Sequence, residues 1–374
     1  MKVVIVNKEI LQNRPPVLST LLTLSDLGYE VSIICVEVND YWRKEFDKRN
    51  VKYHIIPDKT RRDKLSKVLE YLNFKKKVFA YLDKVVDDKQ NTLIWAIGGN
   101  TIYCLGDNIK KYRYALQIQE LHEKDESYKR VFAKVINNAE AVFVNEYNRA
   151  VLYQCWYNMK NRPVVLPNKP YFIDTEAVYD LSPFVKSPIL EKIKNSKVIL
   201  FQGQIVSYRD LSPYIKAAKE LGGYQIVLLG NEYGMIEKYR QIDDSLIYIK
   251  RIPAPQYLGI TAMAHICLIT YDPHTLNNSY CAPNKIYEYG AFGKPMIGND
   301  IPGLKVIEDF HAGCLVNEND LGSIKTSLQR IENEYLLCSE GAKKLYNSVD
   351  NKNTISAFLN SIVRNKGTNN KHII

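Results

Sequence analysis

A lysine and a glutamate three residues apart, Lys285 and Glu288, stand in the segment NSYCAPNKIYEYGAFGKP, residues 277–294. Pro283 suits the first turn of a helix, and the closing Gly-Lys-Pro suits its end. Side chains at positions i and i+3 share one helix face, so both charges point the same way. A helix that presents its first turns to a negatively charged, hydroxyl-bearing ligand can use both. The alternative is an exposed Lys–Glu pair on the surface.

A second candidate is the segment FQGQIVSYRD, residues 201–210, which reads as a strand, a glycine turn and the approach to a helix. Gly203 lets the backbone come close to a ligand, and exposed N–H groups at such a turn suit a phosphate. Arg209 can clamp diphosphate oxygens with its guanidinium group. The alternative is a common strand–helix turn with a surface arginine.

A third candidate is YIKRIPAPQYLGI, residues 248–260, which joins a strand end, a basic pair that includes Arg251, and two prolines. A turn made rigid by proline can present main-chain groups to a heterocyclic base. An ordinary loop is the alternative.

The elements that position these residues alternate between strand-length apolar runs and helical patterns, which predicts parallel sheets covered on both faces. A proline-rich, aperiodic stretch at 164–188 indicates a crossing between two domains. We therefore expect two Rossmann-like, doubly wound α/β domains that face each other across a cleft, with ligands at the carboxyl ends of the strands. The predicted strands are 3–6, 31–38, 92–97, 114–119, 141–145, 197–203, 224–230, 246–250, 266–271, 294–300 and 313–316, and 322–367 is predicted to be helical.

The amino-acid composition indicates to which general class of proteins the chain belongs. The 374 residues are 46% hydrophobic and 25% charged, as in a soluble globular protein. Seven cysteines without a CxxC pair indicate reduced thiols and a cytoplasmic protein. We expect neither a signal peptide nor a membrane span, because no apolar run is long enough.

The net positive charge of the chain is concentrated in its first half. Residues 1–170 carry 29 Lys and Arg against 20 Asp and Glu, which is +9 of the net +10. The densest basic stretch, residues 59–84, has a helical pattern with Leu65, Val68, Leu69, Leu72, Val78 and Leu82 among its basic residues. Such a helix can lie on anionic lipid, or it can simply be a solvated face. No nucleic-acid-binding signature is present, so we expect no nucleic acid partner.

The stretch from about 198 to 320 resembles the donor-binding domain of GT-B glycosyltransferases, particularly the retaining family 4. Arg209 matches that family's basic diphosphate-binding position, and Glu288 matches the second acid of its Glu-x7-Glu motif, which holds the donor ribose. The resemblance also implies a loop whose backbone amides receive donor oxygens, here Pro302, Gly303 and Leu304.

This sequence departs from the family pattern at two positions. Tyr280 replaces the first acid of Glu-x7-Glu, which contacts the transferred sugar, and Gln204 stands where the family has arginine. The variant Pro-Asn-Lys-x-x-Glu-Tyr, which includes Asn284, is similar to that of bacterial surface-polysaccharide transferases. In this variant Lys285 supplies the second positive charge.

The first half resembles the acceptor side of the same family. Glu120, His122 and Glu123 follow an apolar strand at the position that faces acceptor and donor, where His122 would orient the reacting sugar. A satisfied core histidine is the alternative for His122. Arg14 follows the first strand, where acceptor-side loops belong. We expect an acceptor-binding domain at 1–170, a donor-binding domain at 171–350, and a helix at 351–374 that packs toward the first domain and ends in a frayed tail.

The predicted activity is transfer of a hexose from a UDP- or GDP-sugar to a glycan or lipid-linked acceptor in polysaccharide biosynthesis, at the inner face of the cell membrane. Because the chain has no Asp-x-Asp, we expect metal-independent, retaining catalysis by fixed cations and no cofactor. An inverting reaction would need a carboxylate or His122 to take the acceptor proton. Two alternatives remain: a nucleotide-sugar 2-epimerase of the same fold, and a catalytically degenerate binding subunit.

Overall fold

The computed structural model describes residues 1–58 and 64–369. The chain divides into two compact units, and each is built on its own parallel sheet. Unit 1 comprises Met1–Tyr171 together with Asp350–Ile374, and unit 2 comprises Phe172–Val349. The division at 171/172 lies next to the boundary expected from the sequence.

Unit 1 contains a seven-stranded sheet in the order β3-β2-β1-β4-β5-β6-β7, in which every neighbouring pair is parallel. The order runs outward in both directions from β1, which is the doubly wound topology. The strands are β1 Lys2–Val6, β2 Glu30–Cys35, β3 Lys52–Ile55, β4 Thr92–Ile97, β5 Arg113–Ile118, β6 Ala141–Val144 and β7 Val164–Val165. All six side chains of β4 are buried, as expected for a central strand of a covered sheet.

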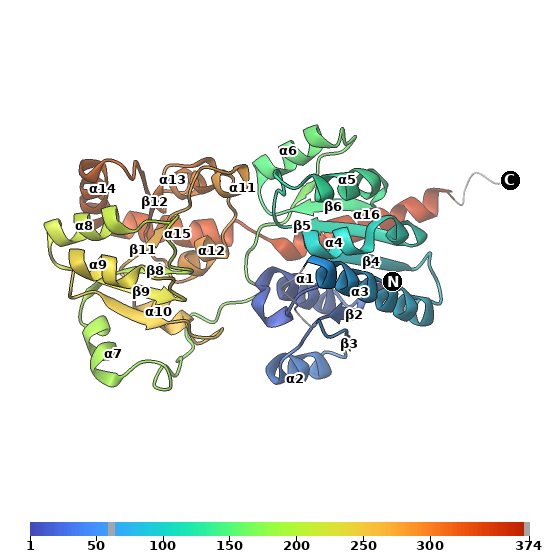
Figure 1. The fold of residues 1–374 in the computed structure, drawn as a ribbon, viewed down its shortest axis with the longest axis horizontal. Helices are drawn as coiled ribbons and strands as arrows, with labels where there is room; N and C mark the ends of the chain where they lie inside the picture. Colours follow the sequence, from blue (N-terminus) through green and yellow to red (C-terminus); the bar gives the residue numbers. More distant parts are fainter. Residues whose placement is uncertain (59–63, 370–374) are drawn as a thin grey trace. The chain divides into compact units, whose positions relative to one another are not determined.

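Helices connect these strands and cover the sheet (Figure 1). They are η1 Leu11–Asn13, α1 Pro15–Asp26, α2 Asp40–Lys48, α3 Lys64–Val85, α4 Gly99–Leu105, η2 Gly106–Lys111, α5 Glu126–Val135, η3 Ile136–Asn138 and α6 Tyr147–Trp156, with α16 Asn351–Asn369 from the end of the chain. Phe358 and Leu359 of α16 belong to the same buried cluster as Trp95 and Phe143 of the sheet. The last helix is thus part of the core of unit 1.

Unit 2 contains a six-stranded parallel sheet in the order β10-β9-β8-β11-β12-β13. The order reverses between β8 and β11, so the sheet has a topological switch point there. Its strands are β8 Lys197–Gln202, β9 Tyr224–Gly230, β10 Ile247–Lys250, β11 Ile266–Ile269, β12 Met296–Asn299 and β13 Gly313–Val316. Its helices are α7 Ser187–Lys194, α8 Ser212–Leu221, α9 Ile236–Ile242, α10 Leu258–Met263, α11 Leu276–Ser279, α12 Asn284–Ala291, η4 Pro302–Leu304, α13 Val306–Asp309, α14 Leu321–Asn333 and α15 Tyr335–Asn347.

The predicted α/β architecture is confirmed, and each predicted strand has a counterpart within a few residues. The prediction was wrong about the start of 164–188, because Val164 and Val165 form β7 and pair with β6. Sequence periodicity did not reveal β3, whose four residues are exposed or half-buried. The tail expected to be helical forms α14, α15 and α16, whereas the expected frayed end at 370–374 lies outside the described residues.

No helix within residues 1–58 and 64–369 has the length and apolar character needed to cross a membrane.

Truncation of a buried α16 side chain tests the role of this helix. Leu359→Ala should lower the free energy of unfolding of unit 1 by about 2–5 kcal/mol, because it leaves a cavity in the core. The chain's three tryptophans, Trp42, Trp95 and Trp156, all lie in unit 1, so their fluorescence during denaturation reports this unit. Val363→Ala, at a half-exposed position on the same helix, is the control and should leave the midpoint unchanged. An unshifted Leu359→Ala midpoint would contradict this assignment of α16.

Candidate functional site

The turn after β8 brings backbone and a cation into contact at the carboxyl edge of the unit 2 sheet. Gly203 adopts φ +151°, and a Cβ added to it would lie 2.6 Å from the Nζ atom of Lys285. A side chain at position 203 would therefore displace the lysine. The Nζ atom also lies 5.5 Å from the centre of the Phe201 ring. This explains why the sequence has glycine directly after the strand.

Lys285 is a cation with no ion-pair partner among the described residues. Among the described residues no carboxylate lies within ion-pair distance of its ammonium group. Burial, followed by the positive charge of Arg209, lowers the pKa of Lys285 to about 8, while Glu288 acts in the opposite direction. Holding two cations close together in a partly buried site is unfavourable unless an anion joins them. The arrangement therefore holds two cations close together beside the glycine turn.

Glu288 is held in place by neutral hydrogen-bond donors. Its side chain is 5% exposed, and it accepts hydrogen bonds from the hydroxyl of Tyr257 (2.7 Å) and the amide of Gln202 (2.7 Å). Thr261 in turn donates to the Gln202 carbonyl oxygen at 2.9 Å. Burial raises the pKa of Glu288, and the hydrogen bond from Tyr257 opposes that rise. The alternative of an exposed Lys285–Glu288 surface pair is thus wrong.

Arg209 lies in the turn before α8 and stacks on an aromatic ring. Its guanidinium carbon lies 4.5 Å from the centre of the Tyr271 ring, and its Nε atom is buried without a hydrogen-bond partner among the described residues. Stacking of this kind orients the guanidinium plane and leaves its edge donors free. Arg209 and Lys285 thus present two cations near the same glycine turn.

The remaining donor-side candidates lie at the carboxyl ends of neighbouring strands. Pro302, Gly303 and Leu304 form η4 after β12, and a Cβ on Gly303 would lie 2.4 Å from the backbone N and O of Cys281. The predicted loop therefore packs directly against the chain next to Tyr280, which caps α11. Asn284 is the first residue of α12. Gln204 follows the glycine turn, and Arg251 follows β10; both side chains are exposed.

His122 lies at the carboxyl edge of the unit 1 sheet, after β5. It adopts φ +52° and stacks on Tyr128, with ring centres 4.5 Å apart and planes 13° apart. Its Nε2 atom is buried, has no hydrogen-bond partner among the described residues, and lies 2.0 Å from where a Cβ on Gly99 would be. Burial lowers its pKa, so the neutral ring is favoured near pH 7. The alternative of a fully satisfied core histidine is wrong.

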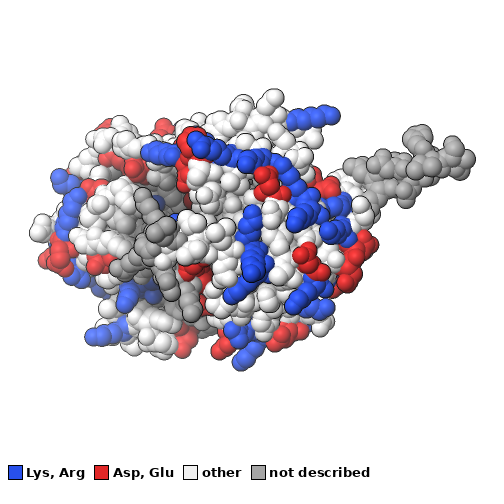
Figure 2. All heavy atoms as spheres, turned by 45° about the vertical axis from the view of Figure 1, so that its right-hand side comes forward, with Lys and Arg blue, Asp and Glu red and all other residues white. Residues whose placement is uncertain are grey.

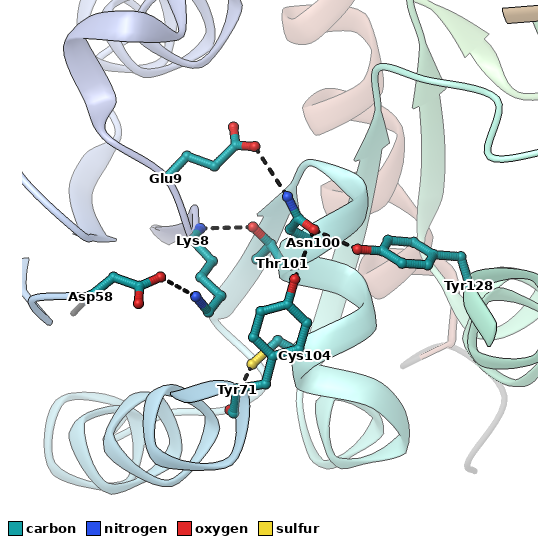
Figure 3. A network of polar contacts seen from close by, with 8 residues as sticks. All are labelled: Lys8, Glu9, Asp58, Tyr71, Asn100, Thr101, Cys104 and Tyr128. Atoms are coloured by element: carbon teal, nitrogen blue, oxygen red, sulfur yellow. Dashed lines mark hydrogen bonds and ion pairs between the residues drawn. The ribbon is translucent and has the colours of Figure 1, made fainter. Parts of the chain in front are cut away.

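A polar network at the same edge of unit 1 joins four separate elements (Figure 3). Glu9, which follows β1, accepts a hydrogen bond from Asn100 of α4 (3.5 Å) and forms an ion pair with Arg14. The Asn100 carbonyl oxygen accepts from Tyr71 of α3 (3.0 Å) and Tyr128 of α5 (2.5 Å). Burial raises the pKa of Glu9, and nearby Glu120 raises it further.

The structure thus groups the predicted donor-side residues Gly203, Arg209, Lys285 and Glu288. Of the acceptor-side residues, Arg14 belongs to the network, Glu120 is exposed at its border, and Glu123 is half-buried one residue after His122.

Sequence reasoning missed several residues that complete these sites, namely Gln202, Tyr257, Thr261, Tyr271, Glu9 and Asn100. For Tyr257 a signal existed, since it lies in the proline-bearing segment already singled out as a candidate loop. Glu9 lies three residues after the end of the first strand, in the region where ligands bind in such sheets. Within the part of the chain that the structure describes, no group of three or more His, Cys, Asp or Glu is placed to hold a metal ion.

Comparison with known proteins identifies the fold. No family model and no curated protein matches the sequence. Among solved structures, Anabaena Alr3699/HepE in complex with UDP and glucose matches with a TM-score of 0.70 and 11% identity over 98% of this chain and 100% of that one. Sucrose-phosphate synthase from Thermosynechococcus elongatus matches with a TM-score of 0.66 and 15% identity over 98% of both chains.

A putative UDP-N-acetylglucosamine 2-epimerase from Listeria monocytogenes also matches, with a TM-score of 0.68 and 11% identity over 97% of both chains. Matches that cover both units show that the chain has the GT-B fold, as the sequence predicted. At these identities they show the fold and not the activity.

The low pKa of Lys285 makes anion binding at Gly203 dependent on pH. A lysine with pKa of about 8 loses its proton as pH rises through that value, so its charged fraction falls about tenfold between pH 7 and pH 9. UDP affinity, measured by calorimetry, should weaken several-fold over this range. Lys285→Arg should remain charged and show a flat profile. Wild-type affinity that does not change between pH 7 and pH 9 would contradict the role of Lys285.

Proposed function

We propose that this protein is a glycosyltransferase that moves a hexose from a nucleoside-diphosphate sugar, with UDP or GDP, to a glycan or lipid-linked acceptor. One observation carries the proposal: Lys285, a cation with no ion-pair partner among the described residues, points at the Gly203 turn beside Arg209. A diphosphate supplies the negative charge that this pair lacks. The structural match to a protein bound to UDP and glucose supports the same ligand class.

The cations act on the leaving group. When the bond between the anomeric carbon and the β-phosphate oxygen breaks, its electron pair stays with the diphosphate, whose negative charge increases. Lys285 and the guanidinium edge of Arg209 stabilise that charge because they are already in place and need no reorganisation. The proposed catalysis therefore requires neither a metal ion nor a cofactor.

The nucleoside is proposed to lie beside α12. Glu288 accepts two hydrogen bonds, and a carboxylate has room for about four, so it can also accept from ribose hydroxyls. The loop after β10, with Arg251, and the turn at Gln204 border the same sheet edge. Tyr280, Asn284 and the η4 amides are proposed to contact the sugar or phosphates, since they follow β11 and β12.

The acceptor is proposed to bind unit 1, where His122, Arg14, Glu120 and Glu123 lie at or near one sheet edge. The acceptor oxygen attacks the anomeric carbon on the face from which the diphosphate leaves, which retains configuration, and the departing phosphate oxygen takes the acceptor proton. The PNKxxEY pattern supports membership of the family-4-like transferases that build bacterial surface polysaccharide. We accordingly place the enzyme in the cytoplasm, at the inner face of the membrane.

A 2-epimerase is the second candidate, because a putative epimerase has the same fold. In addition, the structure reveals one more carboxylate near His122 than the sequence predicted. That carboxylate is Glu9, whose pKa is raised by burial and by Glu120. Incubating the protein with UDP-N-acetylglucosamine alone separates the two reactions. Slow release of UDP supports a transferase and conversion to the 2-epimer supports an epimerase, whereas no turnover of any of a panel of UDP- and GDP-sugars supports a binding subunit.

Replacing Arg209 tests the catalytic part of the proposal. Arg209→Ala should lower kcat by about 10²–10³, the usual cost of removing one fixed donor, with the fold unchanged by circular dichroism. Arg209→Lys is the matched control, since it keeps the charge and loses only the planar fork, so a smaller loss is expected. Donor turnover is the readout, and excess chelator should leave it unchanged. A wild-type kcat/KM in Arg209→Ala would refute the assignment.

A further inference from the structure

Helix α3 has two separate apolar faces. Phe74, Val78 and Leu82 are at most 3% exposed and pack into unit 1. By contrast, Val68 and Leu72 are 56% and 58% exposed. Burial in the core therefore does not explain this second face.

The second face is a contiguous patch that also includes Leu69, which is 64% exposed. Residues i and i+4 lie on one helix face, so Val68 and Leu72 are adjacent and Leu69 borders them. The other exposed large hydrophobic residues of the described chain have no close neighbour of this kind in the sequence, apart from the pair Leu336–Leu337. We call Val68, Leu69 and Leu72 the α3 patch. A clustered apolar surface of this kind marks an interaction site more often than scattered residues do.

Lysines border the α3 patch. Residues 64–85 contain six lysines against two acidic residues. Lys75 and Lys76 follow Leu72 by three and four positions, so they continue the same side of the helix. Figure 2 shows further Lys and Arg side chains on one face of the molecule, with uncharged surface and some Asp and Glu side chains between them. Aliphatic side chains bordered by lysines match the interface of an anionic bilayer, where the chains enter the acyl boundary and the ammonium groups reach the headgroups.

We propose that the α3 patch is a membrane-docking surface that binds an anionic lipid bilayer. This extends the proposed function, and the following step rests on it. Tyr71 precedes Leu72 on α3, and its hydroxyl donates to Asn100, whose amide contacts Glu9 (Figure 3). Tyr71, which belongs to the polar network, and Leu72, which belongs to the α3 patch, are thus consecutive residues of one helix. An acceptor with a hydroxyl-bearing headgroup on a lipid can place its headgroup at the network while its lipid stays in the bilayer.

Vesicle co-sedimentation tests the surface directly. The full-length protein should bind phosphatidylcholine–phosphatidylglycerol vesicles at low salt and bind pure phosphatidylcholine vesicles at least about tenfold more weakly, because lysines attract the anionic headgroups. A triple variant, Val68→Ser, Leu69→Ser and Leu72→Ser, should lose about tenfold or more of the affinity for the anionic vesicles. The matched control is Leu336→Ser with Leu337→Ser, which removes exposed leucines from α15 and should bind like the wild type.

UDP binding, followed by thermal shift, keeps this proposal separate from the proposed function. Unchanged UDP binding in the triple variant shows that it is folded and that its nucleotide site is intact. Two results would overturn membrane docking: wild-type protein that stays in the supernatant with anionic vesicles at low salt, or a triple variant that sediments like the wild type. A dimer in light scattering that the triple variant abolishes would also overturn it, since a second copy would then cover the patch.

Discussion

The account depends on one constraint, a lysine ammonium held beside a glycine turn with no carboxylate of the described residues within ion-pair distance. A side chain at position 203 would collide with the Lys285 ammonium group. Burial and the positive charge of Arg209 lower the pKa of Lys285. An isolated buried charge is costly, and proteins usually pair it. Its retention at the carboxyl edge of a parallel sheet is what an anionic ligand would explain.

The surrounding structure prevents the obvious internal pairing. Glu288 lies one helical turn from Lys285, but Tyr257 and Gln202, which belong to other elements, each donate a hydrogen bond to one of its oxygens and hold the carboxylate in place. Those hydrogen bonds fix the start of α12 against β8 and the loop after β10. The same contacts keep the carboxylate from moving toward the ammonium group. These neutral hydrogen-bond donors hold Glu288 in place, so the Lys285 ammonium group remains available to a ligand.

Much of this arrangement could be predicted from the sequence, and the limits have physical reasons. The glycine, the arginine and the Lys–Glu spacing are local patterns, so the sequence predicted their shared sheet edge. The partners of Glu288 could not be found in this way, because they come from segments 31 and 86 residues away. In α3, the sequence showed apolar residues among lysines but not which of them are buried, since hydrophobicity alone does not tell which residues meet the core. Strand β7 was missed because two residues carry no periodicity.

A crystal structure of the protein with UDP tests the central claim most directly. The account predicts phosphate oxygens within hydrogen-bond distance of the Lys285 ammonium and the Arg209 guanidinium, with the ribose beside Glu288. A nucleotide bound elsewhere in unit 2, with Lys285 and Arg209 free of phosphate contacts, would contradict it.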